Sequence, residues 1–274
     1  MGINKLKEIS DQYKSLLKLD GNPVAVKLFK EPVELEGVAA RKLDKHLTLC
    51  QLISQVWYVS RTNFINPVIV GTTDGLGCAL GTACFGWTKL TAENARKYVG
   101  SYFVTQGQAE GVINAIPSFN ENEYASILIA PLDDCPVNPD VVVFYGNVGQ
   151  MISIFRGYLH NKEEGLSFNT TALAACADAI ITPIKYGRFN LALPCNGFRL
   201  NALPSETDLI CGIPMNKLEE VLEGIKFNFR GGVRYPTAWQ HIDRDLSIIF
   251  PLYKYISGEP SSETDTTMSS ETPK

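Results

Sequence analysis

The chain has 274 residues, of which 45% are hydrophobic and 20% charged, and its formal net charge is −4. This length and composition predict a globular protein with a substantial core. Lysine and arginine are scattered rather than gathered in a stripe, which argues against nucleic acid as a partner. No apolar run approaches the roughly 18–20 residues that cross a bilayer, and the first residues lack the apolar part of a secretory signal. The sequence therefore predicts a cytoplasmic protein without a membrane partner.

The first quarter of the chain alternates between helical and extended patterns. Apolar spacing predicts helices over residues 3–19 and 46–60 and strands over 24–29 and 67–73. In the second helix, Thr48 is a candidate N-cap, and this would place Cys50 in the first helical turn.

The rest of the chain continues this alternation. Further helices are predicted at 91–100, 105–116, 147–161, 172–184 and 215–227, and strands at 124–132, 140–146, 165–171, 188–195 and 208–214. The pattern predicts an α/β or α+β fold, with a mixed sheet and flanking helices in a single globular domain over residues 1–256. Residues 257–274 are rich in Ser, Thr, Glu and Pro and are predicted to be a disordered tail.

Seven cysteines are spread along the chain, at positions 50, 78, 84, 135, 176, 195 and 211. An odd number of cysteines in a chain without an export signal argues against a disulfide framework. The alternatives are buried thiols, metal ligands or a redox role. Cys84, Cys135 and Cys211 are expected to pack as small hydrophobic side chains.

The stretch GTTDGLGCALGTACFGW, residues 71–87, contains five glycines after a predicted strand. Gly75, Gly77 and Gly81 approach the G-x-G-x-x-G pattern, but the third glycine is one position late and no Walker motif follows, so nucleotide binding is disfavoured. We expect these glycines at the mouth of a ligand or metal pocket, with Cys78 facing inward. At least one of the three is expected at positive φ.

Three other observations concern thiolates. Cys50 at a helix start, Cys78 in the glycine stretch and Cys195 after a strand lie where backbone N–H groups stabilise a thiolate. Cys176, in an alanine-rich helix, is a further candidate ligand. We expect Cys50, Cys78 and Cys195 to converge although they are far apart in sequence.

Arginines provide a second kind of candidate site. Arg234 follows a Gly-Gly pair in FRGGVRYP, and a guanidinium group beside exposed N–H donors suits a carboxylate or phosphate. Arg199 could join it. If the protein binds a small anion, Arg199 and Arg234 should face one cavity near the glycine stretch.

The segments LCQLISQVWYV, GCALG, PCNGFR and DLICGIP together resemble the DUF169 family of bacteria and archaea. The resemblance covers roughly residues 5–255, and its most recognisable points are Cys50, Cys78 with Gly81, and Gly197 with Arg199. The resemblance implies a cytoplasmic location and a recurrent cysteine pattern. It implies no reaction, because the family is uncharacterised.

Three functional hypotheses follow. The first is a redox or metal-binding protein in which Cys50, Cys78, Cys195 and Cys176 hold an iron–sulfur cluster or another soft metal, with an electron-transfer partner. The alternative is a metal-free regulatory domain in which Arg199 and Arg234 bind a small anionic ligand and the cysteines only pack. A thiol enzyme with Cys78 as nucleophile ranks last, because no histidine base is identifiable.

Overall fold

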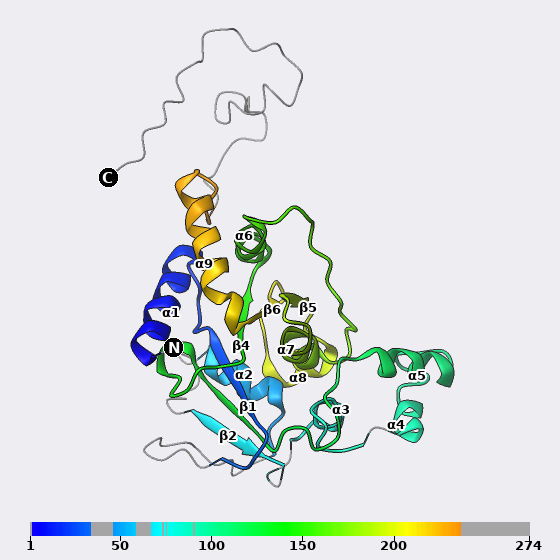
Figure 1. Ribbon diagram of the computed structural model, residues 1–274. Coiled ribbons are helices and arrows are strands. Elements are labelled where there is room, and N and C mark those ends of the chain that lie inside the picture. Colours follow the sequence, from blue (N-terminus) through cyan, green and yellow to red (C-terminus); the bar gives the residue numbers. More distant parts are fainter. Residues whose placement is uncertain are drawn as a thin grey trace, which may run out of the picture. The chain divides into compact units, whose positions relative to one another are not determined.

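A six-stranded sheet forms the centre of the computed structural model, which describes residues 2–33, 46–58, 67–72, 74, 76–89 and 91–236 (Figure 1). The strand order is β2-β3-β1-β4-β6-β5, and every one of its pairings is antiparallel. The strands are β1 (Val24–Phe29), β2 (Val68–Gly71), β3 (Ser126–Pro131), β4 (Val141–Gly146), β5 (Asn190–Ala192) and β6 (Leu209–Pro214).

Helices connect and cover these strands. They are α1 (Ile3–Leu17), α2 (Leu49–Trp57), α3 (Ala79–Cys84), α4 (Ala92–Arg96), α5 (Gln106–Ala115), the short 3-10 turn η2 (Leu132–Asp134), α6 (Val148–Leu159), the π-helical segment η3 (Ala177–Ile181), which continues into α7 (Thr182–Tyr186), α8 (Asn196–Ala202) and α9 (Met215–Arg230).

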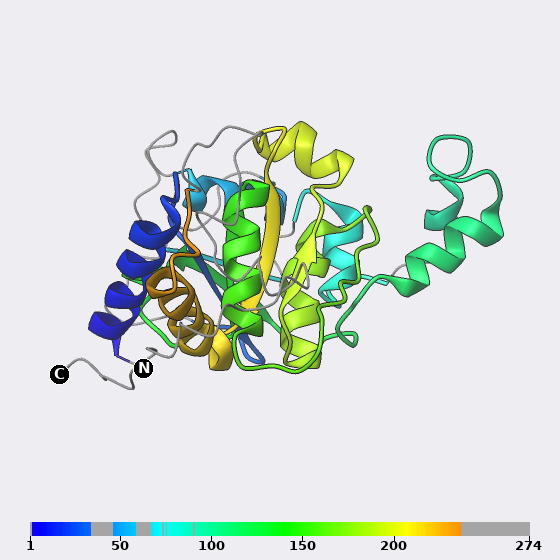
Figure 2. The same ribbon diagram turned by 90° about the horizontal axis from the view of Figure 1, so that it is seen from above.

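The two faces of the sheet are covered by different helices. In β4 the neighbouring side chains of Phe144 and Tyr145 point to opposite faces, as successive strand residues do. The Phe144 ring lies 4.8 Å from Tyr13 of α1, and the Tyr145 ring lies 5.1 Å from Trp57 of α2. Helices α1, α6 and α9 cover the first face and α2, α8 and η3–α7 the second (Figure 2). Burial on both faces explains why β3 and β4 consist almost entirely of apolar residues.

Two elements stand apart from this layered body. Helices α4 and α5 project from it as an arm (Figures 1 and 2). Two hydrogen bonds hold the chain that follows α5 against the body. Lys185 Nζ donates to the Ser118 carbonyl at 2.7 Å, and the Phe119 N–H donates to the Cys84 carbonyl at 2.8 Å.

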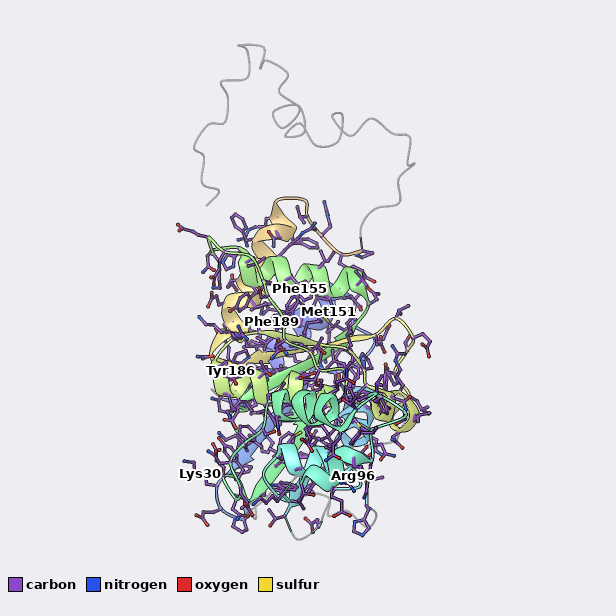
Figure 3. The ribbon with its side chains drawn as sticks, turned by 90° about the vertical axis from the view of Figure 1, so that its right-hand side faces the viewer. Lys30, Arg96, Met151, Phe155, Tyr186 and Phe189 are labelled. Atoms are coloured by element: carbon purple, nitrogen blue, oxygen red, sulfur yellow. The ribbon has the colours of Figure 1, made fainter. Side chains whose placement is uncertain are left out.

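The segment 165–171, predicted as a strand, is irregular instead, and that prediction is wrong. Its Phe168 packs 5.1 Å from Phe155 of α6, and Phe155 in turn lies 5.3 Å from Phe189 before β5. Figure 3 shows Phe155 and Phe189 side by side. Ring packing and side-chain hydrogen bonds therefore hold this segment in place, whereas a strand would be held by backbone hydrogen bonds to a neighbouring strand.

The prediction of one helix-flanked sheet is confirmed, and of the two alternatives the structure has the α+β fold. The sheet, expected to be mixed, is antiparallel in each of the pairings that the structure describes. Within the described part of the chain, no helix combines the length and apolar character that a membrane crossing requires. The predicted boundary at residue 256 and the predicted tail lie outside the described residues.

Candidate functional site

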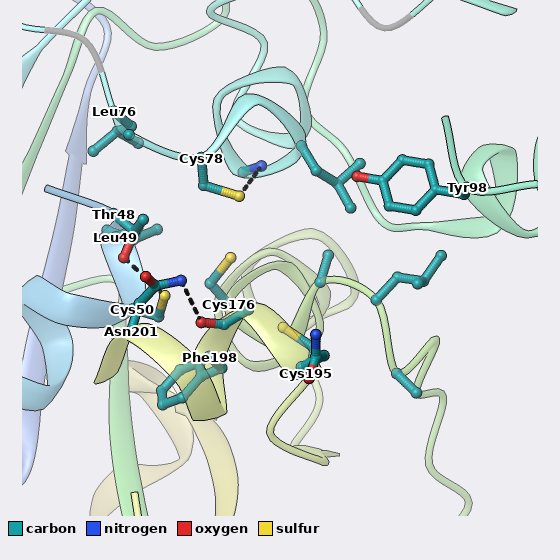
Figure 4. Close-up of a pocket in the computed structure, with 18 of the residues that line it drawn as sticks. Thr48, Leu49, Cys50, Leu76, Cys78, Tyr98, Cys176, Cys195, Phe198 and Asn201 are labelled. Carbon is teal, nitrogen blue, oxygen red and sulfur yellow. Dashed lines mark hydrogen bonds between the residues drawn. The ribbon is translucent and has the colours of Figure 1, made fainter. Parts of the chain in front are cut away.

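A cavity of about 240 Å³ lies between the starts of several helices on the α2 side of the sheet. Four of the seven cysteines line it, and Figure 4 shows their sulfur atoms directed toward the space between them. The residues that form its wall are Thr48, Leu49, Cys50, Leu76, Gly77, Cys78, Leu80, Gly81, Tyr98, Tyr102, Ala172, Leu173, Ala174, Cys176, Cys195, Asn196, Gly197, Phe198 and Asn201.

Cys50 is placed by the N-cap of α2. Thr48 accepts a hydrogen bond from the Gln51 N–H, and the Gln51 side chain accepts one from the Thr48 N–H, which is a complete capping box. The Thr48 hydroxyl also lies 3.0 Å from Cys50 Sγ. The predicted cap and the first-turn position of Cys50 are therefore confirmed.

Cys78 is itself the N-cap of α3, and its Sγ accepts a hydrogen bond from the Gly81 N–H at 3.4 Å. The preceding Gly77 donates its N–H to the Leu47 carbonyl at 3.0 Å. A Cβ on Gly77 would lie only 2.8 Å from the His46 carbonyl oxygen, so the two backbone segments meet only because residue 77 is glycine. This contact brings Cys78 beside the start of α2.

Cys195 is the N-cap of α8, where the Arg199 N–H donates to its carbonyl at 2.9 Å. The helix is anchored by Phe198, whose side chain is buried and lies 5.7 Å from the ring of Tyr145. Neither α3 nor α8 was predicted from the sequence, and both begin at a cysteine of the cavity.

Cys176 lies just before η3, at the end of a loop that hydrogen bonds to Asp178 hold in place. The fully buried Asp178 accepts hydrogen bonds from the Thr171 N–H at 3.0 Å and the Thr170 hydroxyl at 3.2 Å. Burial raises the pKa of the Asp178 carboxyl above its usual range, against these hydrogen bonds. The loop then passes through Ala172, whose φ of 55° lies in the left-handed region that alanine rarely adopts. Residues 172–174 of this loop form the cavity wall beside Cys176.

The cavity wall is electrically neutral apart from its thiols, because no described residue that lines it carries a formal charge. Burial, and after it the neighbouring Cys195 and Cys78, raises the pKa of Cys50 to about 11, against the hydrogen bond with Thr48. Burial also raises the pKa of Cys176 well above its ordinary value. These two thiols are therefore protonated near neutral pH unless a bound cation displaces the protons.

The four sulfur atoms surround one space, but they are not close enough to one another to hold a single metal ion together. Among the described residues, no three His, Cys, Asp or Glu side chains are spaced to hold one metal ion. The expected convergence of Cys50, Cys78 and Cys195 on one cavity is present, with Cys176 added. Their role as ligands stays a prediction.

The glycines of the stretch behave differently from one another. Neither Gly77 nor Gly81 has the positive φ expected of at least one glycine here, and Gly75 lies outside the described residues. Among the described residues of this stretch, the glycine at positive φ is Gly86, at 76°, after the end of α3. Gly77 and Gly81 do line the cavity, as expected.

The two arginines do not share a cavity, and this expectation is wrong. Arg199 lies on α8 and forms an ion pair with Glu206 at 2.8 Å, and it does not line the cysteine cavity. Arg234 borders a different, small cavity beside α9, and its guanidinium lies 5.3 Å from the centre of the Phe229 ring. Their local partners, an exposed carboxylate and an aromatic ring, hold the two cations at separate places.

Sequence reasoning missed the tyrosines of the cavity. Tyr98 and Tyr102 follow α4 on the arm, and their rings lie 5.8 Å apart. Figure 4 shows the Tyr98 hydroxyl pointing into the cavity. No spacing relates these residues to the cysteines, so only the fold of the arm could reveal them.

Comparisons with known proteins identify the family of the chain. The DUF169 family model, described as "Uncharacterised ArCR", matches residues 13–224, which include all four cysteines of the cavity. An uncharacterised protein of Methanocaldococcus jannaschii, MJ0308, is 28% identical over 232 residues, covering 82% of this chain and 96% of the relative. No solved structure gave a significant match. The chain belongs to the DUF169 family.

Proposed function

We infer that the protein binds a soft metal through the thiolates of Cys50, Cys78, Cys176 and Cys195, as a metal-binding or redox protein. The observation that carries this inference is that four cysteines from four separate segments line one cavity with no charged side chain in its described wall. Each sulfur would lose its proton to solvent as its bond to the metal forms.

The charge balance of the cavity supports a cation as the occupant. Among its described residues the wall has no lysine, arginine or histidine, so thiols that lose their protons there would repel one another unless a cation lies between them. Thiolate is also the ligand that soft metals and iron–sulfur clusters prefer. The metal-free alternative, a small anion held by Arg199 and Arg234, lacks a shared cavity.

The redox state of the cysteines bears on the compartment. All seven cysteines are free thiols in the structure. Free thiols are typical of reducing compartments, and together with the sequence features they support our proposal that the protein is cytoplasmic.

The test is the metal content of a cysteine series. Protein purified anaerobically and incubated with iron and sulfide should contain both and absorb near roughly 400 nm, as thiolate–iron centres do. Single replacements of the four cavity cysteines by serine should each lower the iron content. Cys135→Ser is the matched control, because Cys135 is buried away from the cavity wall and donates to the Val137 carbonyl at 3.0 Å. Equal metal content in the series and the control, or an unaltered protein that binds neither iron with sulfide nor a single soft ion such as Cd²⁺, would contradict the inference.

A further inference from the structure

Gly81 leaves an open space between two of the cavity sulfurs. An ideal Cβ built on this residue would lie 3.7 Å from Cys78 Sγ and 3.9 Å from Cys176 Sγ. Its nearest contact of all, 3.6 Å to Cys78 Cβ, is an ordinary van der Waals distance. A methyl group would therefore fit, and it would occupy the gap that the two sulfurs flank.

The fold gives no reason for glycine at this position. Gly81 lies inside α3, and its φ is not in the left-handed region. Within a helix, glycine is less favourable than alanine by up to about 1 kcal/mol. At Gly77 the explanation is steric, because a Cβ there would collide with the His46 carbonyl, but at Gly81 no such collision exists.

The spacing of the thiols indicates what the space accommodates. In a tetrahedral site with metal–sulfur bonds of about 2.3 Å, the sulfurs lie only about 3.8 Å from one another. The described side chains show no group of three ligands spaced in that way. The cavity of about 240 Å³ is instead many times the roughly 10–15 Å³ that a single water molecule needs.

We propose that the space over Gly81 binds a polynuclear metal–sulfur cluster of the iron–sulfur class, and that the core of this cluster contacts Gly81 between Cys78 and Cys176. Glycine at this position leaves the volume that the core of a cluster needs, because a side chain there would occupy part of it. This proposal rests on the proposed thiolate metal site and adds the kind of metal group and the residue that makes room for it.

The experiment compares Gly81→Ala with Gly111→Ala. Gly111 lies in α5, is exposed and has no atom within 4 Å of its hypothetical Cβ, so its replacement adds the same methyl group to a helix away from the cavity. Each variant and the unaltered protein are incubated anaerobically with iron, sulfide and dithiothreitol. Iron and sulfide per chain are then measured, and binding of a single Cd²⁺ ion is followed separately by its thiolate absorption.

In Gly81→Ala we expect iron and sulfide per chain to fall by up to about tenfold, the effect of overpacking one methyl group. The melting temperature should be unchanged or higher, and Cd²⁺ binding should be retained. Gly111→Ala should match the unaltered protein in iron and sulfide.

Three outcomes would overturn the proposal. If Gly81→Ala holds as much iron and sulfide as the unaltered protein, the cluster does not rest on Gly81, while the thiolate site itself survives. If Gly81→Ala loses Cd²⁺ and cluster together, or melts at a lower temperature, the methyl group disturbs the fold and glycine has a structural role. If the unaltered protein binds Cd²⁺ but never iron with sulfide, the site takes single ions. Binding of neither would instead remove the proposed function.

Discussion

Burial controls the acidity of the cysteine thiols that lie outside the cavity. It raises the pKa of Cys84 to about 12, against a hydrogen bond with Ser118, and that of Cys135 to about 11. Burial raises the pKa of Cys211 still further. These thiols stay protonated at neutral pH and behave as packing groups, as expected from the sequence.

The raised pKa of Cys135 predicts a loss of stability in alkaline solution. The folded protein holds this proton up to about pH 11, whereas the unfolded chain releases it near the ordinary value of 9.0. The stabilisation is complete below pH 9 and disappears as the pH rises through 11, by up to about 3 kcal/mol in the free energy of unfolding. Urea unfolding of metal-free protein across this range should show a shallower decline for Cys135→Ser. Parallel declines in the two proteins would contradict this assignment.

Short capped helices place the cavity thiols. Three of the four cysteines occupy the N-cap or first turn of α2, α3 or α8, so the start of each helix fixes one sulfur. For α2 the capping box was predictable, because Thr48 stands directly before an amphipathic run with Gln51 three residues later.

The cap of α2 makes a measurable contribution. Thr48→Ala removes the acceptor for the Gln51 N–H and the hydroxyl beside Cys50, and we expect it to lower the free energy of unfolding by about 1 kcal/mol. Thr48→Ser keeps the hydroxyl and should cost clearly less. Urea denaturation of the three proteins checks this, and equal stability of the alanine and serine variants would show that the cap hydrogen bond is not the cause.

The elements that could be predicted are those with a long or continuous apolar pattern. The helices at α1, α6 and α9 and the strands β1, β3, β4 and β6 appear where the sequence predicts them. Helices α3 and α8 were missed because six and seven residues span barely two turns, too few to show a period. In α3 the Sγ of the N-cap residue Cys78 accepts the Gly81 N–H, and α8 is held by its packing on α2 and by the buried Phe198 beside Tyr145.

The site as a whole depends on topology. Cys50 and Cys195 are separated by much of the chain, and strand order, which brings their helices together, cannot be obtained from local pattern. The candidate cysteines themselves could be chosen from their local setting. The arginine pairing failed because Arg199 lies on α8 and Arg234 follows α9, and these two helices cover opposite faces of the sheet.

At the scale of the whole molecule, the cavity joins segments from four places in the chain on one face of the sheet. A group bound to Cys50, Cys78, Cys176 and Cys195 would cross-link α2, α3, η3 and α8, whereas α1 and α9 lie on the opposite face. Because such a group binds the folded state and not the unfolded chain, loading should raise the melting temperature.

Hydrogen exchange can locate this cross-link. After incubation with iron and sulfide, amide protection should increase in α2, α3 and α8 and stay nearly unchanged in α1 and α9, because local opening of the cavity helices would then require breaking metal–sulfur bonds. Cys195→Ser, treated identically, should lose the added protection in α8 most of all, since that helix begins at the missing ligand. The measurement is mass-spectrometric exchange on metal-free and loaded protein. Protection that rises evenly over all helices would mean that the ligand stabilises the protein globally without bridging these segments, and the four-cysteine site would have to be abandoned.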